Sequence, residues 1–527
     1  TFFTGSPVRF APAAWHDRLF VAGDDGHLYC LSVATGKLLW KRRGGPGEDM
    51  LLGNDRMVSR WPARGGPVVL GDVVYFGAGI WPSEGIYLYA LDPRTGDVLW
   101  QNDSSGTIEM DQPHPTAKAK SGISAQGYLV AAGDDLLVPT GRAVPAVLSR
   151  SDGTLRNFFL QAHQHSGGSD VVVDQYFANS GSVYSIADGR KIGTVGLQTA
   201  VTPDYFIHAV DNTLFALDRR NLTVERETVD RKGNKRQVTD LAAPAWQVPL
   251  TFDAEPPAPL AEELRPPEVR MDSTAWATPT LDGQASALIV AGNTVLVGGR
   301  GRLSAMDIPT RELAWSIGVS GTVDGLAVAD GRLYVSTDQG LIHCYGDPRN
   351  VPPKDSHFVP PVQIPQRGLP VRKAAREIVE RTGVADGYCV DLGCAEGGLT
   401  LELALRTNLR IYAVDPDPAN VQRLREALDL LGHYGARVTV HCFDPAEVPY
   451  PDYFADLVVS GRSLTEEPNE ELLATAHRLC RPYGGTLALG AAGDIRVSRR
   501  GPLEGAGNWT HQNSSPANTL CSDEQLV

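Results

Sequence analysis

Residues 17–40 read DRLFVAGDDGHLYCLSVATGKLLW, and residues 72–100 repeat the pattern as DVVYFGAGIWPSEGIYLYALDPRTGDVLW. In each copy two alternating apolar segments are followed by a Thr-Gly pair and a third segment that ends at Trp40 or Trp100. Alternation with a period of two, bounded by Gly and Asp turns, is typical of antiparallel β-strands. The stretch therefore predicts a small sheet that occurs more than once in the chain.

Weaker copies of this pattern continue as far as residue 347, and the copy over 287–315 has Arg311 where the first two have the Gly of Thr-Gly. A four-stranded unit cannot bury both faces of its sheet alone, whereas radial stacking of such units leaves only short edges exposed. We expect an all-β propeller of about seven or eight blades over residues 1–347. The closing Trp side chains would then pack between neighbouring blades.

The order of an aliphatic-aromatic strand, Leu-Asp, Thr-Gly and a closing Trp resembles the quinoprotein-like propeller repeat. The resemblance implies the fold and leaves the function open, because the family contains both quinone-dependent dehydrogenases and non-catalytic scaffolds. Catalytic members have adjacent cysteines and a calcium site, but the 7 cysteines here are scattered. Pyrroloquinoline quinone (PQQ) is therefore an unlikely cofactor, and the cysteines are interpreted as buried free thiols.

Two segments interrupt the repeat. Residues 223–272 form a long insertion that is first charged and then proline-rich, which favours a solvated loop. Residues 161–170 read QAHQHSGGSD, and His163 and His165 on one strand would point the same way. With no carboxylate or Cys partner identified, a polar blade edge is favoured over a metal site, and we expect no bound metal.

The pattern changes after a proline-rich linker over residues 348–370. Residues 371–500 alternate between segments with strand and helix periodicity, which predicts a parallel sheet with helices on both faces. The predicted helices are 371–383, 398–406, 419–432 and 469–480, and the predicted strands are 387–392, 410–415, 436–444, 454–461 and 484–490. The chain is thus expected to be multidomain, with a propeller and an α/β Rossmann-like domain.

A candidate ligand site lies at the first strand of this second domain, where residues 390–401 read VDLGCAEGGLTL. Asp391 ends the strand, and Gly393 and Gly397 allow a sharp turn close to a ligand before the helix starts. Asp415 and Asp444 end the second and third strands, where carboxylates can bind a ribose and an adenine edge. These residues alone fit either a dinucleotide or another adenine nucleoside.

The stretches DLGCAEGG, AVDPD, FDPAEVPYPDYFADLVV and RLCRPYGG together resemble the class I S-adenosylmethionine-dependent methyltransferases, particularly the type 11 group. The resemblance implies S-adenosylmethionine as a cofactor, with Asp391 and Gly393 beside its methionine part, Asp415 at the ribose and Asp444 at the adenine. Ala395 stands where the middle glycine is usual, and Tyr483 replaces the first glycine of the last motif.

The catalytic residues and the methyl acceptor are not identified by this resemblance. Arg462, Ser463 and Glu466 are candidates only by their location after the fourth strand. Methyl transfer can proceed by positioning the acceptor next to the sulfonium, so the lack of an evident general base does not exclude activity.

The formal net charge of -14 opposes binding to nucleic acid, and no apolar run is long enough for a transmembrane helix. The partner is expected to be an unknown protein or polymer on the propeller face. Because a signal peptide could have been removed, the compartment stays open between the periplasm or cell envelope, where such propellers usually act, and the cytoplasm, where S-adenosylmethionine is made. Residues 501–527 are interpreted as a return strand or the start of a further propeller.

Three functions follow from these expectations. The first is a propeller scaffold whose second domain binds S-adenosylmethionine and transfers a methyl group. The second is a non-enzymatic envelope scaffold with a degenerate methyltransferase domain. The third and least favoured is a quinone-dependent dehydrogenase.

Overall fold

The computed structural model describes residues 2–112, 117–141, 143–159, 168–229, 233, 235–250, 285–347, 349, 362 and 364–525. The chain divides into two compact units, each of which is described by itself. The first unit comprises Thr1–Ala11, His16–Ala63 and His357–Val527, and the second comprises Pro12–Trp15 and Arg64–Ser356.

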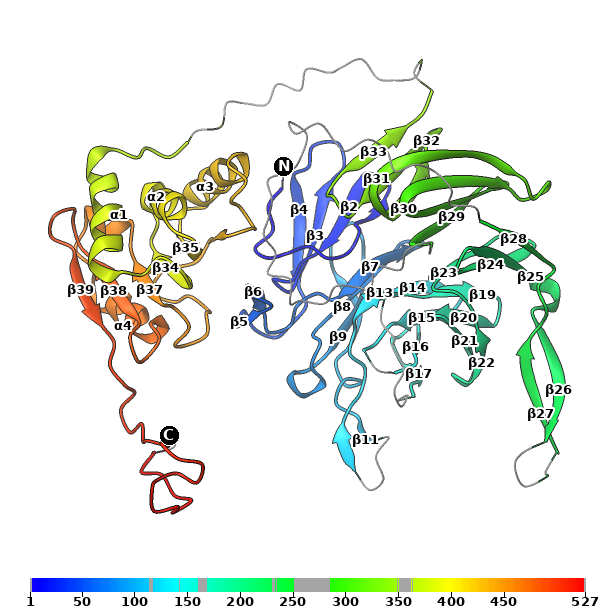
Figure 1. Ribbon diagram of the computed structural model, residues 1–527, viewed down its shortest axis with the longest axis horizontal. Coiled ribbons are helices and arrows are strands. Elements are labelled where there is room, and N and C mark those ends of the chain that lie inside the picture. The colour runs from blue at the N-terminus through cyan, green and yellow to red at the C-terminus, as the bar shows by residue number, and fades with distance from the viewer. Residues whose placement is uncertain are drawn as a thin grey trace. The chain divides into compact units, whose positions relative to one another are not determined.

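The second unit is a series of mainly antiparallel sheets, each a neighbour in sequence of the next (Figure 1). The short β13 is the exception, because it pairs in parallel with β7 and β18. One sheet has the order β10-β9-β8-β7-β13-β18, and those that follow are β14 to β17, β19 to β22, β23-β24-β25-β28 and β29 to β33. The bounds of the principal strands are β7 (Gly65–Leu70), β8 (Val73–Ala78), β9 (Tyr87–Leu91), β10 (Val98–Asn102), β13 (Gly127–Tyr128), β14 (Val130–Ala132), β15 (Asp135–Val138), β16 (Ala146–Ser149), β17 (Leu155–Asn157), β18 (Gly168–Ser169), β19 (Val171–Val173), β20 (Tyr176–Asn179), β21 (Ser182–Ser185), β22 (Lys191–Thr194), β23 (Gln198–Val201), β24 (Tyr205–Val210), β25 (Thr213–Asp218), β28 (Trp246–Pro249), β29 (Ala287–Ala291), β30 (Thr294–Asp307), β31 (Leu313–Ala329), β32 (Arg332–Thr337) and β33 (Ile342–Tyr345).

The Trp that closes the second copy of the repeat packs against the next sheet, as predicted. The indole N–H of Trp100, on β10, donates to the carbonyl of Arg150 in the following sheet (2.8 Å). An added Cβ on Gly153, in the turn between β16 and β17, would lie 2.5 Å from the same indole ring. An aromatic side chain therefore holds the sheet of β10 to the following sheet. Trp315, which closes a later copy, is 40% exposed, so the predicted burial of the closing Trp is wrong for that copy.

Two details of the repeats differ from the expectation. The copies over 287–315 and 332–347 share one sheet, because the long β31 pairs with both β30 and β32. The insertion does not start as a loop: β26 (Thr223–Val229) and β27 (Lys235–Leu241) form an antiparallel hairpin, and β28 returns to the preceding sheet. Thr and Val, which favour strands, lie at both ends of β26, and the charged residues between them are compatible with a hairpin exposed to water. Residues 251–284, and His163 and His165, lie outside the described residues.

The first unit contains the strands β2 (Arg18–Ala22), β3 (His27–Ser32) and β4 (Leu38–Arg43), the hairpin β5 (Met50–Gly53) and β6 (Arg56–Ser59), and an α/β domain. The sheet of this domain has the order β36-β35-β34-β37-β38-β39, and only β39 is antiparallel to its neighbour. Its strands are β34 (Tyr388–Leu392), β35 (Arg410–Val414), β36 (Val438–His441), β37 (Leu457–Val459), β38 (Thr486–Leu489) and β39 (Arg496–Arg499). The strand order reverses between β34 and β37, which creates a crevice at their carboxyl ends.

Helices and a hairpin cover this sheet. One face packs against α1 (Leu369–Thr382), α2 (Gly398–Arg406) and α3 (Pro418–Leu430) through a buried cluster that includes Ile378, Leu401 and Leu424. The other face packs against α4 (Glu470–Leu479), and Met50 and Met57 of the β5–β6 hairpin belong to the same cluster. The sheet is therefore buried on both sides, as a parallel sheet requires.

Several predicted boundaries need correction. β36 ends at His441, so Asp444 lies in the turn after the strand and not at its end. β39 was not predicted, because two of its four residues, RVSR, are charged. Residues 501–525 contain turns and one isolated bridge between His511 and Ser514, and no strand is assigned to this described segment.

All 7 cysteines are unpaired. Cys30, Cys389, Cys394 and Cys480 are buried as predicted, whereas the prediction of buried thiols is wrong for Cys344, Cys442 and Cys521, which are exposed. Within the described part of the chain, no helix has the length and apolar character that a membrane span needs. The same residues contain no group of three or more His, Cys, Asp or Glu side chains arranged to hold a metal ion.

Candidate nucleoside site

The turn between β34 and α2 has the geometry expected of a ligand-binding turn. Gly393 and Gly397 have φ angles of 83° and 81°, in the left-handed region that glycine tolerates best. Ala395 also lies in this region, with φ 51°, at a cost of about 1 kcal/mol for a residue with a Cβ. The alanine that replaces the usual glycine thus keeps the glycine-like backbone.

Steric crowding, in addition to the backbone angle, requires a glycine at position 397. An added Cβ on Gly397 would lie 2.5 Å from Cδ1 of Leu424, which is buried on α3. The turn is consequently pressed against α3, and α2 starts directly after it at Gly398.

Asp391, at the end of β34, is fully buried and accepts two hydrogen bonds. The N–H of Gly461 donates to its Oδ1 (2.7 Å), and the hydroxyl of Thr400 donates to its Oδ2 (2.6 Å). Burial raises the pKa of this carboxyl to about 6, the two hydrogen bonds oppose the rise, and the charge of Asp415 adds to it. Asp391 therefore ties the turn to α2 and to the segment after β37.

Asp415 follows β35 and is also fully buried. Its Oδ2 accepts from the N–H of Ala395 (2.9 Å), and its Oδ1 accepts from the N–H of Asp417 (3.0 Å) and from the side-chain amide of Asn420 (3.0 Å). A fourth donor is the guanidinium of Arg462, 3.3 Å from Oδ2. The structure thus brings Asp415 into direct contact with the turn of Ala395.

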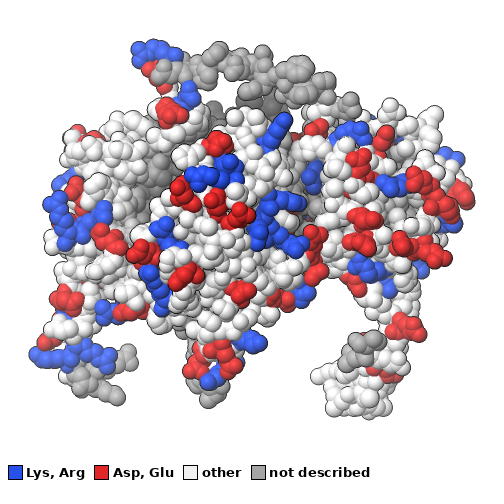
Figure 2. Space-filling model, turned by 180° about the vertical axis from the view of Figure 1, so that it is seen from behind, with Lys and Arg blue, Asp and Glu red and all other residues white. Residues whose placement is uncertain are grey.

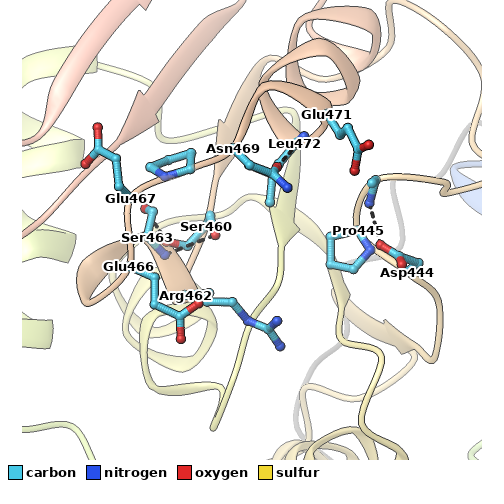
Figure 3. Close-up of a pocket in the computed structure, with 12 residues that line it drawn as sticks. Asp444, Pro445, Ser460, Arg462, Ser463, Glu466, Glu467, Asn469, Glu471 and Leu472 are labelled. Atoms are coloured by element: carbon cyan, nitrogen blue, oxygen red, sulfur yellow. Dashed lines mark hydrogen bonds between the residues drawn. The ribbon is translucent and has the colours of Figure 1, made fainter.

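Asp444 lies apart from these two carboxylates. It is exposed, and its Oδ1 accepts from the N–H of Ala446 in a local turn (2.9 Å). It lines a cavity of about 270 Å³. Figure 3 shows Asp444 and Pro445 on one side of this cavity and Ser460, Arg462 and Ser463 on the other. The full lining is Asp444, Pro445, Ala446, Ser460, Arg462, Ser463, Glu466, Glu467, Pro468, Asn469, Glu471 and Leu472.

Arg462 links the cavity to the turn. It begins a short 3-10 helix (Arg462–Leu464), and its N–H donates to the carbonyl of Gly393 (2.7 Å). Sequence reasoning placed Arg462 only near the fourth strand. Its pairing with Asp415, and the Thr400 bond to Asp391, were missed because contacts between side chains distant in sequence leave no local pattern. A signal did exist for Thr400, since a hydroxyl one turn into α2 faces the strand end that precedes it.

Comparison with known proteins agrees with this geometry. A family model described as a methyltransferase domain matches residues 389–484. The carboxy-S-adenosyl-L-methionine synthase of Trichlorobacter lovleyi is 34% identical over 105 residues, which are 19% of this chain and 42% of that protein. The synthase of the same name from Geobacter metallireducens is 37% identical over 111 residues, which are 20% of this chain and 44% of that protein. The chain spans less than half the length of these curated relatives.

The β-rich part matches a different family. A model described as outer membrane protein assembly factor BamB matches residues 4–221 and 243–346. Among solved structures, BamB from Moraxella catarrhalis is 15% identical, covers 63% of this chain and 82% of its own, and has a TM-score of 0.36. The two family models confirm the predicted combination of a propeller with a methyltransferase domain. Because the BamB model matches more than half of the 527 residues, the chain belongs to the family of outer membrane protein assembly factor BamB.

Proposed function

We propose that the methyltransferase domain binds S-adenosylmethionine at the edge of its sheet, and that the propeller is the scaffold that brings an acceptor or partner to it. One observation carries the proposal: Asp391 and Asp415 end neighbouring parallel strands, and the carboxylate of Asp415 bonds the turn between Gly393 and Gly397. Ligands of such sheets bind at the carboxyl ends of the strands next to the reversal of strand order.

Each residue has a distinct part in this proposal. The backbone of Gly393, Ala395 and Gly397 lies against the methionine side of the nucleoside. Asp415 accepts the ribose hydroxyls, and Asp444 lies towards the adenine. The names of the two curated relatives concern a derivative of S-adenosylmethionine, which supports this ligand class. The cavity beyond Arg462 and Ser463 is then the place for the methyl acceptor, whose identity stays open.

The test is binding of S-adenosylhomocysteine to the full chain, measured by isothermal titration calorimetry. Substitution Asp415→Ala should weaken binding by about 1–3 kcal/mol, because charge-assisted hydrogen bonds to the ribose are lost. Asp429→Ala, an exposed carboxylate near the end of α3, is the matched control and should bind like the wild type. Equal affinity of the Asp415→Ala variant and the wild type would refute the assignment.

A second candidate is a non-enzymatic scaffold whose methyltransferase domain no longer binds the nucleoside. The four donors already bonded to Asp415 favour this candidate, because they occupy the carboxylate that the ribose needs. Absence of any nucleoside binding by the wild type would select it.

The partner of the propeller is proposed to be a protein or polymer of the cell envelope, in keeping with the family to which the chain belongs. On the face drawn in Figure 2, Lys and Arg side chains are interspersed with Asp and Glu, and the net charge is -14. Neither feature favours a nucleic acid as the partner. Cell fractionation followed by immunodetection tests the location, and recovery with cytoplasmic proteins would refute the envelope proposal.

We expect the propeller to bind no PQQ, since adjacent cysteines are absent from the sequence. Incubation with PQQ and calcium, followed by dye reduction with alcohols as substrates, should give no turnover. Sustained turnover would revive the dehydrogenase hypothesis.

A further inference from the structure

The carboxylate of Asp415 has no acceptor position left for a ribose. An ionised carboxylate offers about four lone-pair sites. Four donors take them: the N–H groups of Ala395 and Asp417, the amide of Asn420 and the guanidinium of Arg462. A nucleoside whose hydroxyls bond to Asp415 must therefore displace at least one of these donors.

Arg462 is the donor that can leave. The N–H groups of Ala395 and Asp417 belong to the backbone of turns that flank Asp415, and Asn420 is fixed in the first turn of α3. The Arg462 side chain is 36% exposed, and its 3.3 Å contact with Asp415 is the longest of the four. A long, partly exposed side chain can take another rotamer without disturbing the sheet.

The guanidinium also lies beside the turn itself. The position of a Cβ added to Gly393 is 3.7 Å from Nε of Arg462. In Figure 3 the Arg462 side chain extends from its short helix into the space that faces Asp444 and Pro445. The proposed function puts the methionine side of the nucleoside against this turn, so the positive charge of Arg462 would lie on the side that carries the sulfur.

We propose that Arg462 determines which nucleoside the site accepts, in two ways. It occupies the ribose position on Asp415 until the nucleoside displaces it, and its charge disfavours the positive sulfonium of S-adenosylmethionine relative to the neutral thioether of S-adenosylhomocysteine. This inference rests on the proposed function, since it assumes that the nucleoside binds at Asp415. Both effects follow from one side chain and can be separated by changing its length and its charge independently.

The experiment measures the Kd of S-adenosylhomocysteine and S-adenosylmethionine for the full-length wild type and the variants Arg462→Ala and Arg462→Gln. Arg462→Ala should lower the Kd of S-adenosylhomocysteine about three- to tenfold. The reason is that Asp415 can then accept the ribose hydroxyls without first losing its bond to Arg462. The Kd of S-adenosylmethionine should fall by at least about a further threefold, because the repulsion between the guanidinium and the sulfonium is also removed. Arg462→Gln keeps a hydrogen-bond donor on a shorter side chain but removes the charge. We expect it to lower the Kd of S-adenosylmethionine and to leave that of S-adenosylhomocysteine nearly unchanged.

Arg406→Ala is the matched control. Arg406 lies at the opposite end of α2, is 35% exposed and pairs with the buried Glu402, so its loss reproduces the loss of an ion pair away from the site. Its Kd values should equal those of the wild type. Circular dichroism of each variant separates a lost fold from a changed affinity, and the milder Arg462→Gln substitution keeps the test decisive if Arg462→Ala unfolds.

The outcomes distinguish this inference from the function on which it rests. If the wild type binds both nucleosides and neither Arg462 variant changes an affinity or the ratio, the role of Arg462 is refuted and the site assignment stands. If neither the wild type nor any variant binds either nucleoside, the proposed function fails and the inference fails with it.

Discussion

The Thr-Gly turn of the propeller repeat and the glycine turn after β34 both require residues in the left-handed region, yet they are built differently. In the first copy of the repeat, unlike the copy that contains Gly153, the turn glycine is uncrowded: Gly36 has φ 66° with nothing within 4 Å of an added Cβ. Its N–H donates to the carbonyl of Ser32, four residues earlier. In the methyltransferase turn, Gly397 is in contact with α3, and Ala395 bonds Asp415, twenty residues later. The first turn is held by local contacts, and the second by contacts across the sheet.

This difference explains where each turn has changed in sequence. Arg311 takes the glycine position of a repeat with φ 64°, which a solvent-exposed turn permits. In the methyltransferase turn the replaced glycine is Ala395, and Gly397 is retained at the position where a side chain would collide with Leu424. A backbone angle alone can be met by another residue at about 1 kcal/mol, whereas a steric requirement cannot.

The largest effect should come from adding one methyl group to the crowded glycine. Gly397→Ala should lower the free energy of unfolding of the methyltransferase domain by about 2–4 kcal/mol, because the Cβ overlaps Leu424 at an unfavourable φ. Urea unfolding followed by far-ultraviolet circular dichroism measures this, since the described α-helices all lie in this domain. The matched Gly36→Ala variant should lose only about 1 kcal/mol, seen as faster amide exchange in that turn. Equal losses in the two variants would contradict the distinction between the turns.

The next effect is a pH dependence of stability, which we expect for the methyltransferase turn and not for the Thr-Gly turn. Burial raises the pKa of Asp391 from 3.8 to about 6, so the folded protein keeps this proton to a higher pH than the unfolded chain does. The stability that this group contributes is therefore full below pH 3.8 and is lost as the pH rises through 6, by on the order of 3 kcal/mol.

Urea unfolding at several pH values between 4 and 7 should show this loss in the wild type and a smaller one in Asp391→Asn. Asn keeps an acceptor for Gly461 and has no proton to lose in this range. An equal decrease of the free energy of unfolding with pH in both proteins would show that Asp391 does not cause the pH dependence.

A smaller effect is expected from the local hydrogen bonds of a repeat turn. The carboxylate of Asp92 accepts from the N–H of Arg94 (2.6 Å) and of Thr95 (3.3 Å). Asp92→Ala should cost about 1 kcal/mol, read as faster amide exchange of the strands on both sides. Asp97→Ala removes an exposed carboxylate that accepts from the Thr95 hydroxyl, and should change the free energy of opening, measured by amide exchange, by less than about 0.5 kcal/mol. A larger effect of Asp97 than of Asp92 would refute the role given to the local bonds.

The smallest effect should be a gain in the stability of a repeat turn. Arg311→Gly relieves the strain of a side chain in the left-handed region. It should raise the free energy of opening of the turn, measured by amide exchange, by about 0.5–1 kcal/mol. Faster exchange in the variant would mean that the Arg311 side chain itself stabilises the turn.

These contrasts also explain how far the sequence predicted the structure. α2 was predicted at its observed bounds of 398–406, because a glycine turn and an apolar helix adjoin there without ambiguity. The third strand was extended to Asp444, although it ends at His441, because the residues between look like strand residues and the turn begins only with the Asp444 carboxylate. Period and turn chemistry are local and can be read along the chain.

The site was predicted only in part for the same reason. Asp391, Gly393, Gly397 and Asp415 were assigned from their positions after strands, and the structure brings them to one end of the sheet. The donors on these carboxylates could not be predicted, because Gly461 and Arg462 reach them from a segment about fifty to seventy residues away. Only the folded sheet shows that Asp415 is already fully bonded.

The buried cysteines bear on survival in an oxidising compartment. The thiolate is the form that reacts with oxidants and disulfides, so a thiol that is hard to deprotonate reacts slowly. Burial raises the pKa of Cys389 and Cys394 well above the usual value and that of Cys480 to about 11. In the proposed envelope location these sulfur atoms would stay reduced without a dedicated reductant, and oxidative damage would start at the exposed Cys344, Cys442 and Cys521.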